Sequence, residues 1–284
     1  MQGSSKIGAR ALSARDVRIR QPMPAEGHIE GGAVSHAAQV QQPGPRQKIN
    51  AQAIAPPPAR RYRAALFQTY VIVAAVAFVT LAVVAHTVAY FPIDLSVTRT
   101  VQAYHGIWFA RVMFWVSWIG FMPQVYVVVF GLAISLFVFG LRWEALCLLA
   151  ASCGALLGGL VKLVVYRPRP SADLIHVFAQ LPSSGFPSGH TLEFTCLGGF
   201  LAFIAYTLLK PSVLRVVILS SLGALVLLMG LSRIYQGQHW FSDVCGAYLF
   251  GSLWLIGTIR LYRWGKPRFF VRQPVAPNPN QQAA

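Results

Sequence analysis

The sequence predicts an all-α integral membrane protein, and two observations lead to that prediction. The chain has 284 residues, a mean hydropathy of +0.54 and only 11% charged residues, whereas a soluble domain carries about 25%. Several stretches also supply the roughly 20 mostly apolar residues that a helix needs to cross a bilayer. Lipid is therefore the expected solvent for most of the chain.

The chain divides into three regions by composition. Residues 1–61 are basic, rich in Gln, Ala, Pro and Gly, and lack a sustained apolar period, which predicts a disordered tail. No apolar segment lies near Met1, so a cleaved signal peptide is not expected. Residues 62–265 form the predicted membrane domain, and residues 266–284 form a second predicted disordered tail that is rich in Pro, Asn and Gln.

The membrane domain is expected to be a bundle of six transmembrane helices. Their predicted ranges are Leu66–Tyr90, Pro123–Gly140, Ala145–Val165, Leu192–Leu209, Val213–Leu231 and Val244–Leu261. The connection Phe91–Met122 contains an apolar but interrupted stretch, Ile107–Phe121, with three tryptophans. Aromatic residues favour the membrane interface, so this stretch predicts an interfacial helix.

The net charge of +16 indicates how the chain is oriented in the membrane rather than a nucleic-acid partner. The basic residues of the chain gather in the N-terminal tail and at the ends of apolar segments, near Arg142, Lys210, Arg215 and Arg260. The positive-inside rule then places both termini in the cytoplasm of a multi-pass protein, which we expect in a bacterial cytoplasmic membrane. Anionic membrane lipids would also attract the basic tail.

Three clusters of basic and histidine residues lie on the opposite, extracytoplasmic side. They are Lys162 with Arg169-Pro170, Pro187-Ser188-Gly189-His190, and Ser232-Arg233 with His239 and Asp243. Their cations break the positive-inside pattern, which indicates that they serve chemistry rather than topology. Cations, imidazoles and a carboxylate together suit a bound phosphate that is attacked by a histidine.

The first two clusters supply candidate phosphate ligands. Lys162, Arg169 and Arg233 are the expected cationic ligands of the phosphoryl oxygens. Ser188 stands where a helix N-cap is expected, and Gly189 allows close backbone approach to an anion at the helix start. His190 lies in the first turn of that helix, where its side chain can reach the oxygen of the group that leaves the bound phosphate.

The third cluster supplies the candidate nucleophile. His239 and Asp243 are four residues apart, so both face the same side of a helix. A carboxylate in this position holds one imidazole N–H, fixes the tautomer and leaves the other nitrogen free to attack.

In order and spacing, the three clusters resemble the three-part signature of the type 2 phosphatidic acid phosphatase (PAP2) superfamily. The resemblance covers roughly 90–261 and shows no departure from the pattern Lys-x6-Arg-Pro, Pro-Ser-Gly-His and Ser-Arg-x5-His-x3-Asp. It implies a haloperoxidase-like helical core and hydrolysis without a metal or other cofactor. His239 would form a phosphohistidine, with Asp243 orienting it and His190 acting as general acid. Six apolar segments argue against the soluble haloperoxidase branch.

The expected partners are membrane lipids and a phosphorylated lipid substrate. An outward-facing site favours a polyprenyl (undecaprenyl) diphosphate, while phosphatidic acid, phosphatidylglycerophosphate and lipid A phosphate suit the same chemistry. Two alternatives stay open: phosphotransfer to an acceptor other than water, and a non-enzymatic anion-binding or transport protein. The helix centres contain few ionisable residues, which weakens the case for a transport path.

Two further residues have open roles. Arg167 is either a second phosphate or headgroup contact or an interfacial anchor. Glu193 lies one turn after His190 and either tunes that histidine, pairs with a cation of the site, or solvates the mouth of the helix. The four cysteines form no CxxC pair and are interpreted as small core residues.

Overall fold

A computed structural model describes residues 58–270, and within this range the chain is entirely helix and connecting loop. The elements are α2 (Pro58–Thr87), α3 (Pro92–Gln102), α4 (Ile107–Ile119), α5 (Gln124–Val138), α6 (Arg142–Val165), α7 (Gly189–Leu208), α8 (Val213–Tyr235), α9 (Phe241–Gly265) and the π-helix η1 (Lys266–Phe270). The prediction of an all-α fold is confirmed. The rest of the two predicted tails, including the proposed lipid contact of the N-terminal tail, lies outside the described residues.

Five of these helices are long and apolar enough to cross a membrane: α2, α6, α7, α8 and α9. The sixth predicted span, Pro123–Gly140, corresponds to α5, which has 15 residues. It reaches the required length only together with α4, and the two helices are bent by 63° at the break between them. The described part of the chain therefore has five spans, or six if α4 and α5 count as one broken span.

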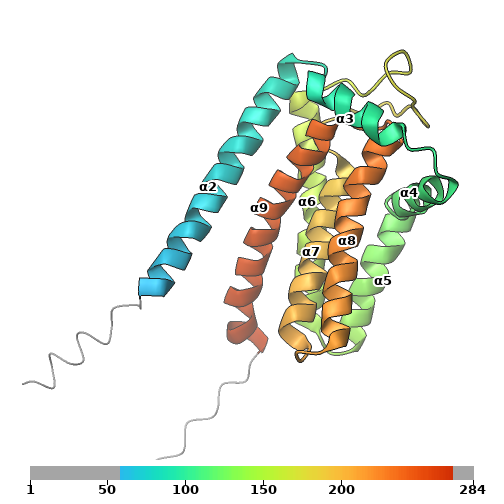
Figure 1. Cartoon of the computed structure of the whole chain (residues 1–284). Helices are drawn as coiled ribbons and strands as arrows, with labels where there is room; N and C mark the ends of the chain where they lie inside the picture. The colour runs from blue at the N-terminus through green and yellow to red at the C-terminus, as the bar shows by residue number, and fades with distance from the viewer. Residues whose placement is uncertain (1–57, 271–284) are drawn as a thin grey trace, which may run out of the picture. The chain divides into compact units, whose positions relative to one another are not determined.

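Helix α7 is the centre of the bundle. In its apolar stretch 56% of the residues are buried, against 6% in α2, which packs at the edge against α9. Figure 1 shows α7 among α6, α8 and α9, and it contacts all three. The apolar residues that remain exposed on the outer helices, such as Val73, Leu163 and Val216, are typical of faces that contact lipid.

The core lies between α5, α6, α7 and α9, where Val129, Leu148, Phe200 and Ala247 are buried. Close approach of the helices depends on small residues. A Cβ atom at Gly251 of α9 would stand 2.8 Å from Cγ2 of Thr195 on α7, so no larger residue fits there without a shift.

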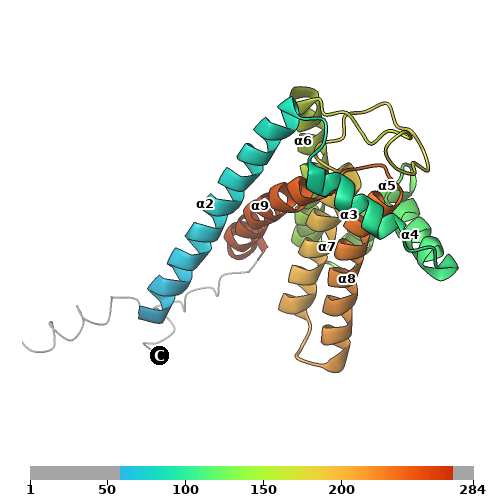
Figure 2. The same ribbon diagram turned by 45° about the horizontal axis from the view of Figure 1, so that its top comes forward.

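The end of the bundle that carries the motif clusters is covered by α3 and by the loop 166–188 (Figure 2). Helix α3 packs across the ends of α8 and α9. No helix is predicted here from the sequence, because α3 is short and lies in the connection between two predicted spans. Pro92 starts it, and Oδ2 of Asp94 accepts the N–H of Phe91 at 3.0 Å, which caps its first turn.

The predicted interfacial helix corresponds to α4. All three of its tryptophans, Trp108, Trp115 and Trp118, are exposed. On the inner side of α4, Ser117 is fully buried against the site described next.

Candidate active site

The three motif clusters converge on one cavity of about 700 Å³ at the covered end of the bundle. Of the predicted site residues, those that line it are Lys162, Arg169, Gly189, His190, Arg233 and His239. They come from α6, α7, α8 and the two loops that follow α6 and α8. Ser188 and Asp243 lie next to this set but do not line the cavity.

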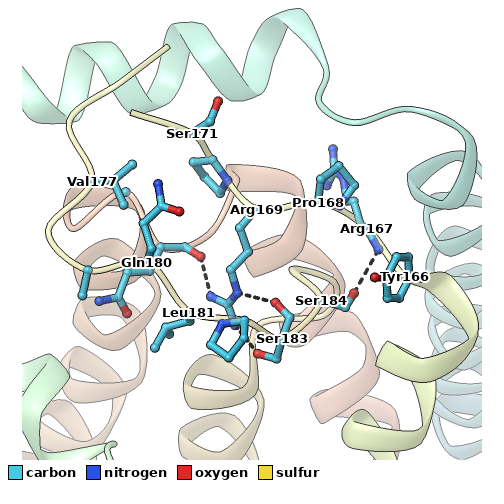
Figure 3. A pocket seen from close by; sticks show the side chains of 15 residues that line it. Tyr166, Arg167, Pro168, Arg169, Ser171, Val177, Gln180, Leu181, Ser183 and Ser184 are labelled. Atoms are coloured by element: carbon cyan, nitrogen blue, oxygen red, sulfur yellow. Dashed lines mark hydrogen bonds between the residues drawn. The ribbon is translucent and has the colours of Figure 1, made fainter. Parts of the chain in front are cut away.

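Two cations are held by backbone carbonyls of the loop 166–188. Lys162, in the last turn of α6, donates to the carbonyl of Ser184 at 2.7 Å. Arg169 donates from Nε to the carbonyl of Ser183 at 2.7 Å and from Nη1 to that of Gln238 at 2.6 Å. Figure 3 shows the Arg169 side chain extended toward Ser183, whose hydroxyl accepts a further bond at 2.9 Å. These contacts fix the two positive charges at the cavity wall.

The third cation, Arg233, is fully buried in the last turn of α8. Its Nη1 donates to the hydroxyl of Ser117 and to Oε1 of Gln236, and its guanidinium lies 5.1 Å from the ring centre of Phe121. Its Nε and Nη2 find no hydrogen-bond partner among the described residues. Burying a hydrogen-bond donor without a partner costs free energy, so we interpret these two N–H groups as donors to a bound anion.

His190 presents a free nitrogen to the same cavity. Its ring stands edge-on to Phe121 at 4.7 Å between ring centres, and its Nε2 is buried without a partner in the described part of the chain. Gly120 lies directly against the ring, because a Cβ atom there would collide with the imidazole. The packing of Phe121 and Gly120 therefore fixes the direction of His190.

The helix start that was predicted to hold the anion begins where expected, but Ser188 acts differently. Ser188 occupies the N-cap position of α7, yet its side chain makes no capping bond to the helix backbone. The hydroxyl is buried and pairs with that of Thr191 at 3.0 Å. Gly189 does line the cavity, so its backbone is the part of this cluster that faces a bound anion.

The contacts of His239 define its tautomer. Nε2 lies 3.1 Å from Nη1 of Arg169. A guanidinium can only donate, so Nε2 must carry the lone pair and Nδ1 the proton. Nδ1 faces Oδ2 of Asp243 at 3.5 Å, which is longer than a well-formed hydrogen bond. The geometry leaves Nε2 as the nucleophilic atom.

The surroundings of His239 also keep the ring neutral. Burial, followed by the positive charge of Arg169 and neighbouring cations, lowers the pKa of His239 well below its usual value of 6.5. A neutral imidazole at neutral pH has an available lone pair, which a nucleophile requires.

Arg167 has neither of the roles expected for it. Its side chain is 0% exposed and forms ion pairs with Asp94 at 2.9 Å and with Asp243 at 2.7 Å. A buried guanidinium that is paired in this way neither anchors the protein at the interface nor faces the phosphate cavity. Figure 3 shows the backbone of Arg167 bonded to the hydroxyl of Ser184.

Glu193 lines the cavity as a buried carboxylate. It is 7% exposed, and no partner for its Oε1 occurs within residues 58–270. It forms no ion pair with a cation of the site in that range, so the pairing considered from the sequence is absent. Its burial also excludes the solvated position at the helix mouth.

The cavity changes character along its length. The end near His239 and His190 is polar, whereas the walls formed by α5 and α6 are mainly apolar. The apolar wall residues include Val125, Tyr126, Val129, Phe130, Leu149 and Leu156. A hydrocarbon chain suits these walls, and a phosphate suits the polar end.

A second pocket of about 500 Å³, the outer pocket, is lined by residues of the loop 166–188 together with Gly237 and Gln238 (Figure 3). Arg169 and Ser183 line both pockets, so the Arg169 side chain forms part of the wall between them. The outer pocket has no contribution from the apolar faces of α5 and α6.

Three residues that support the site were not identified from the sequence. Asp94 pairs with Arg167, while Ser117 and Gln236 orient Arg233. Asp94 had a detectable signal, since a carboxylate three residues into a proline-started segment is typical of a helix start. Ser117 and Gln236 had none.

Taken together, the geometry places two imidazole nitrogens and three cations around a space for a tetrahedral anion. One imidazole is neutral and oriented to attack, and the other points at the same space from a different helix. Such an arrangement can transfer a phosphoryl group to His239 and stabilise the charge on its oxygens.

Comparisons with known proteins agree with the motif resemblance. Residues 142–267 match the family described as the PAP2 superfamily. The chain is 28% identical over 182 residues to phosphatidylglycerophosphatase B of Bacillus subtilis, which covers 62% of this chain and 86% of that protein. It is 34% identical over 116 residues to lipid A 1-phosphatase of Rhizobium etli, which covers 38% of this chain and 45% of that protein.

A solved structure shares the fold. The crystal structure of a transmembrane PAP2 type phosphatidylglycerolphosphate phosphatase from Bacillus subtilis superposes with a TM-score of 0.60 at 23% identity. The match covers 70% of this chain and 98% of that one. The chain therefore shares the overall fold of that structure.

Proposed function

Because the chain belongs to the PAP2 superfamily of membrane lipid phosphatases, we propose that it hydrolyses a phosphate or diphosphate ester of a lipid through a phosphohistidine. One observation carries this proposal. The Nε2 lone pair of His239, which accepts from Arg169, and the unpartnered nitrogen of His190 face one cavity, which is cationic at one end and apolar along its walls.

In the first step, Nε2 of His239 attacks the phosphorus atom of the bound ester. The bond from phosphorus to the leaving oxygen breaks, and His190 donates its proton to that oxygen. Three cations hold the phosphoryl oxygens as negative charge redistributes: Lys162, Arg169 and Arg233. The ring of His239 keeps its proton on Nδ1 and becomes positive, so Asp243 stabilises the phosphohistidine.

In the second step, water replaces the lipid product. Having given up its proton, His190 accepts one from the attacking water, while the P–N bond breaks and its electron pair returns to Nε2. The products are inorganic phosphate and a dephosphorylated lipid. The enzyme returns to its starting state, with the lone pair of His239 restored and the transferred proton back on His190.

The proposed first substrate to test is phosphatidylglycerophosphate. The relative with the longest match has this activity in its name, and the apolar cavity walls accept acyl chains. Polyprenyl diphosphate was favoured from the outward orientation alone, and phosphatidic acid and lipid A phosphate suit the same chemistry. All four place a phosphate on an apolar anchor.

The proposed orientation places this site on the extracytoplasmic side. Support comes from the opposite end of the bundle, where Arg142 begins α6 and Lys266 follows α9. These basic ends are typical of the cytoplasmic face. A bacterial cytoplasmic membrane is the proposed location.

The test is a phosphate-release panel with purified full-length protein and the four lipids in detergent micelles. Release from at least one lipid is expected, together with an acid-labile phosphoprotein that is absent from His239→Ala. The matched control is His176→Ala, an exposed histidine of the loop 166–188, which should retain normal release. Near-normal release by His239→Ala would refute the nucleophile assignment.

Two further measurements separate the alternatives. Phosphate that appears on an added alcohol or sugar in place of free phosphate would indicate phosphotransfer. Activity that collapses in EDTA and returns with Mg²⁺ would contradict a mechanism in which side-chain cations hold the phosphate.

A further inference from the structure

A buried chain of three charged side chains, Asp94, Arg167 and Asp243, lies next to His239. All three side chains are 0% exposed. Arg167 donates from Nη2 to Oδ2 of Asp94 at 2.9 Å and from Nη1 to Oδ1 of Asp243 at 2.7 Å. The proposed chemistry uses only Asp243, so Asp94 and Arg167 need a separate explanation.

Asp94 holds the start of α9 as well as Arg167. Its Oδ1 accepts the N–H of Ser242 at 2.7 Å, and its Oδ2 accepts the hydroxyl of Ser242 at 2.8 Å. Ser242 immediately precedes Asp243, and its hydroxyl also accepts a bond from Nη1 of Arg167 at 2.6 Å. Asp94 on α3 therefore reaches Asp243 by two routes, one through a guanidinium and one through the backbone.

The carboxylate of Asp243 is planar, so the contact to one oxygen sets the direction of the other. Oδ1 is held by Arg167, while Oδ2 accepts the N–H of Trp240 at 2.9 Å and faces Nδ1 of His239 at 3.5 Å. At that separation a small rotation of the carboxylate makes or loses the hydrogen bond to the imidazole. The Arg167 contact controls that rotation.

We propose that Asp94 is a positioning residue, which acts through Arg167 and Ser242 to orient Asp243 toward the ring of His239. Asp94→Asn turns one of the two oxygens into an amide nitrogen, which leaves either Nη2 of Arg167 or the N–H of Ser242 without an acceptor in a buried site, so that donor must move. This inference rests on the proposed function, because it assigns a task to Asp94 in forming the phosphohistidine.

A purely structural role is the alternative, and the chain contains a matched control for it. Glu144 on α6 is also 0% exposed, accepts from Nζ of Lys266 at 2.5 Å and accepts the hydroxyl of Tyr262 at 2.9 Å. It belongs to the opposite end of the bundle and lines neither pocket. Glu144→Gln therefore removes a buried carboxylate of the same kind without touching the site.

The experiment measures single-turnover formation of the phosphoprotein from phosphatidylglycerophosphate, and inhibition by inorganic phosphate as a measure of phosphate binding. Asp94→Asn is expected to slow phosphoprotein formation about 10- to 100-fold, as is typical when a partner that orients a reactive group is lost. Its inhibition constant for phosphate should stay within about threefold. Glu144→Gln should lower the unfolding temperature while the rate of formation stays normal.

A double-mutant cycle tests whether Asp94 acts through Asp243. In an Asp243→Asn background, Asp94→Asn should cause little further loss, because the carboxylate that it orients is already absent. Full additivity of the two losses would overturn the inference, as would a normal rate in Asp94→Asn.

If Asp94→Asn does not fold, Ser242→Ala removes one contact of Asp94 without leaving a buried charge unpaired. It should slow formation about threefold or more, and an unchanged rate would overturn the inference.

Failure of the inference is distinguishable from failure of the proposed function. If the wild-type protein forms no phosphoprotein with any lipid of the panel, the proposed function is wrong. If the wild type forms it and Asp94→Asn forms it equally fast, only the role of Asp94 is wrong.

Discussion

Arg233→Lys is the substitution that tests the phosphate site most directly. Arg233 is fully buried, and Nη1 is already held by Ser117 and Gln236. The atoms left for a phosphate are Nε and Nη2, which have no partner in residues 58–270. Lysine keeps the positive charge but offers a single ammonium in place of a planar fork.

The size of the expected loss follows from those two donors. A hydrogen bond to a charged group contributes about 1.5–3 kcal/mol, and the lysine ammonium replaces one of the two donors, so losing the other costs about 1.5–3 kcal/mol. At about 1.4 kcal/mol for each factor of ten, kcat/KM should fall about 10- to 150-fold. Ser117→Ala, which only frees the guanidinium to rotate, should cost less than Arg233→Lys does.

The assay is phosphate release from phosphatidylglycerophosphate by purified protein, with unfolding temperature as the check on folding. Arg215→Lys is the matched control on the same helix, because Arg215 lies at the opposite end of α8 and stacks on Tyr206. It should stay within about twofold of the wild type, as expected for a substitution away from the site. A folded Arg233→Lys protein within threefold of the wild type would show that Arg233 does not hold the phosphate.

Two further predictions concern the nucleophile and the lipid. Because burial and nearby cations lower the pKa of His239, its neutral form persists on acidification. Phosphoprotein formation should therefore reach half-loss at a pH below 6.5 in a single-turnover titration, and half-loss at or above 6.5 would contradict the assignment. Gly159 lines the apolar wall with open space around it, so Gly159→Leu should block lipid phosphates yet spare a small water-soluble phosphate ester. Gly257→Leu, which also adds a side chain to open space but does not line the cavity, should hydrolyse both.

The local spacing of the motifs was sufficient to predict most of the cavity lining. His190 lies in the first turn of α7, and Lys162 lies in the last turn of α6, near Arg169. His239 and Asp243 are one helical turn apart. Short-range geometry therefore brings the residues of each cluster together. Ser188 takes the predicted N-cap position of α7, but its side chain makes no capping bond. Its hydroxyl pairs with that of Thr191, and the sequence does not show whether it pairs with this hydroxyl or accepts a backbone N–H of the first helical turn.

The supporting residues could not be predicted, because their partners are distant in the chain. Asp94 and Arg167 are 73 residues apart, and Ser117 and Arg233 are 116 apart. Such pairs exist only once α3 and α4 pack against α8 and α9. For the same reason the sequence did not distinguish Arg167, which is paired with carboxylates, from Arg169, which faces the cavity two residues later.

The long helices and α4 were predicted from the sequence, whereas α3 was missed and α5 is shorter than the span predicted for it. A helix of 15 residues such as α5 is about 22 Å long, against about 30 Å of hydrocarbon. Gly140, with a φ of +80°, and Pro123 bound it on either side. A prediction from hydropathy depends only on the number of apolar residues between these boundaries. It does not detect that the chain bends by 63° between α4 and α5.

The contact between Arg169 and His239 links substrate binding to the nucleophile. Nη1 of Arg169 lies 3.1 Å from Nε2 of His239 and also donates to the carbonyl of Gln238. The lone pair that attacks is therefore held by a donor in this structure. A phosphate is a stronger acceptor than a neutral imidazole, so in the proposed mechanism Arg169 turns its donors to the phosphoryl oxygens when the ester binds. The lone pair of His239 then becomes available at the moment when an electrophilic phosphorus atom lies beside it.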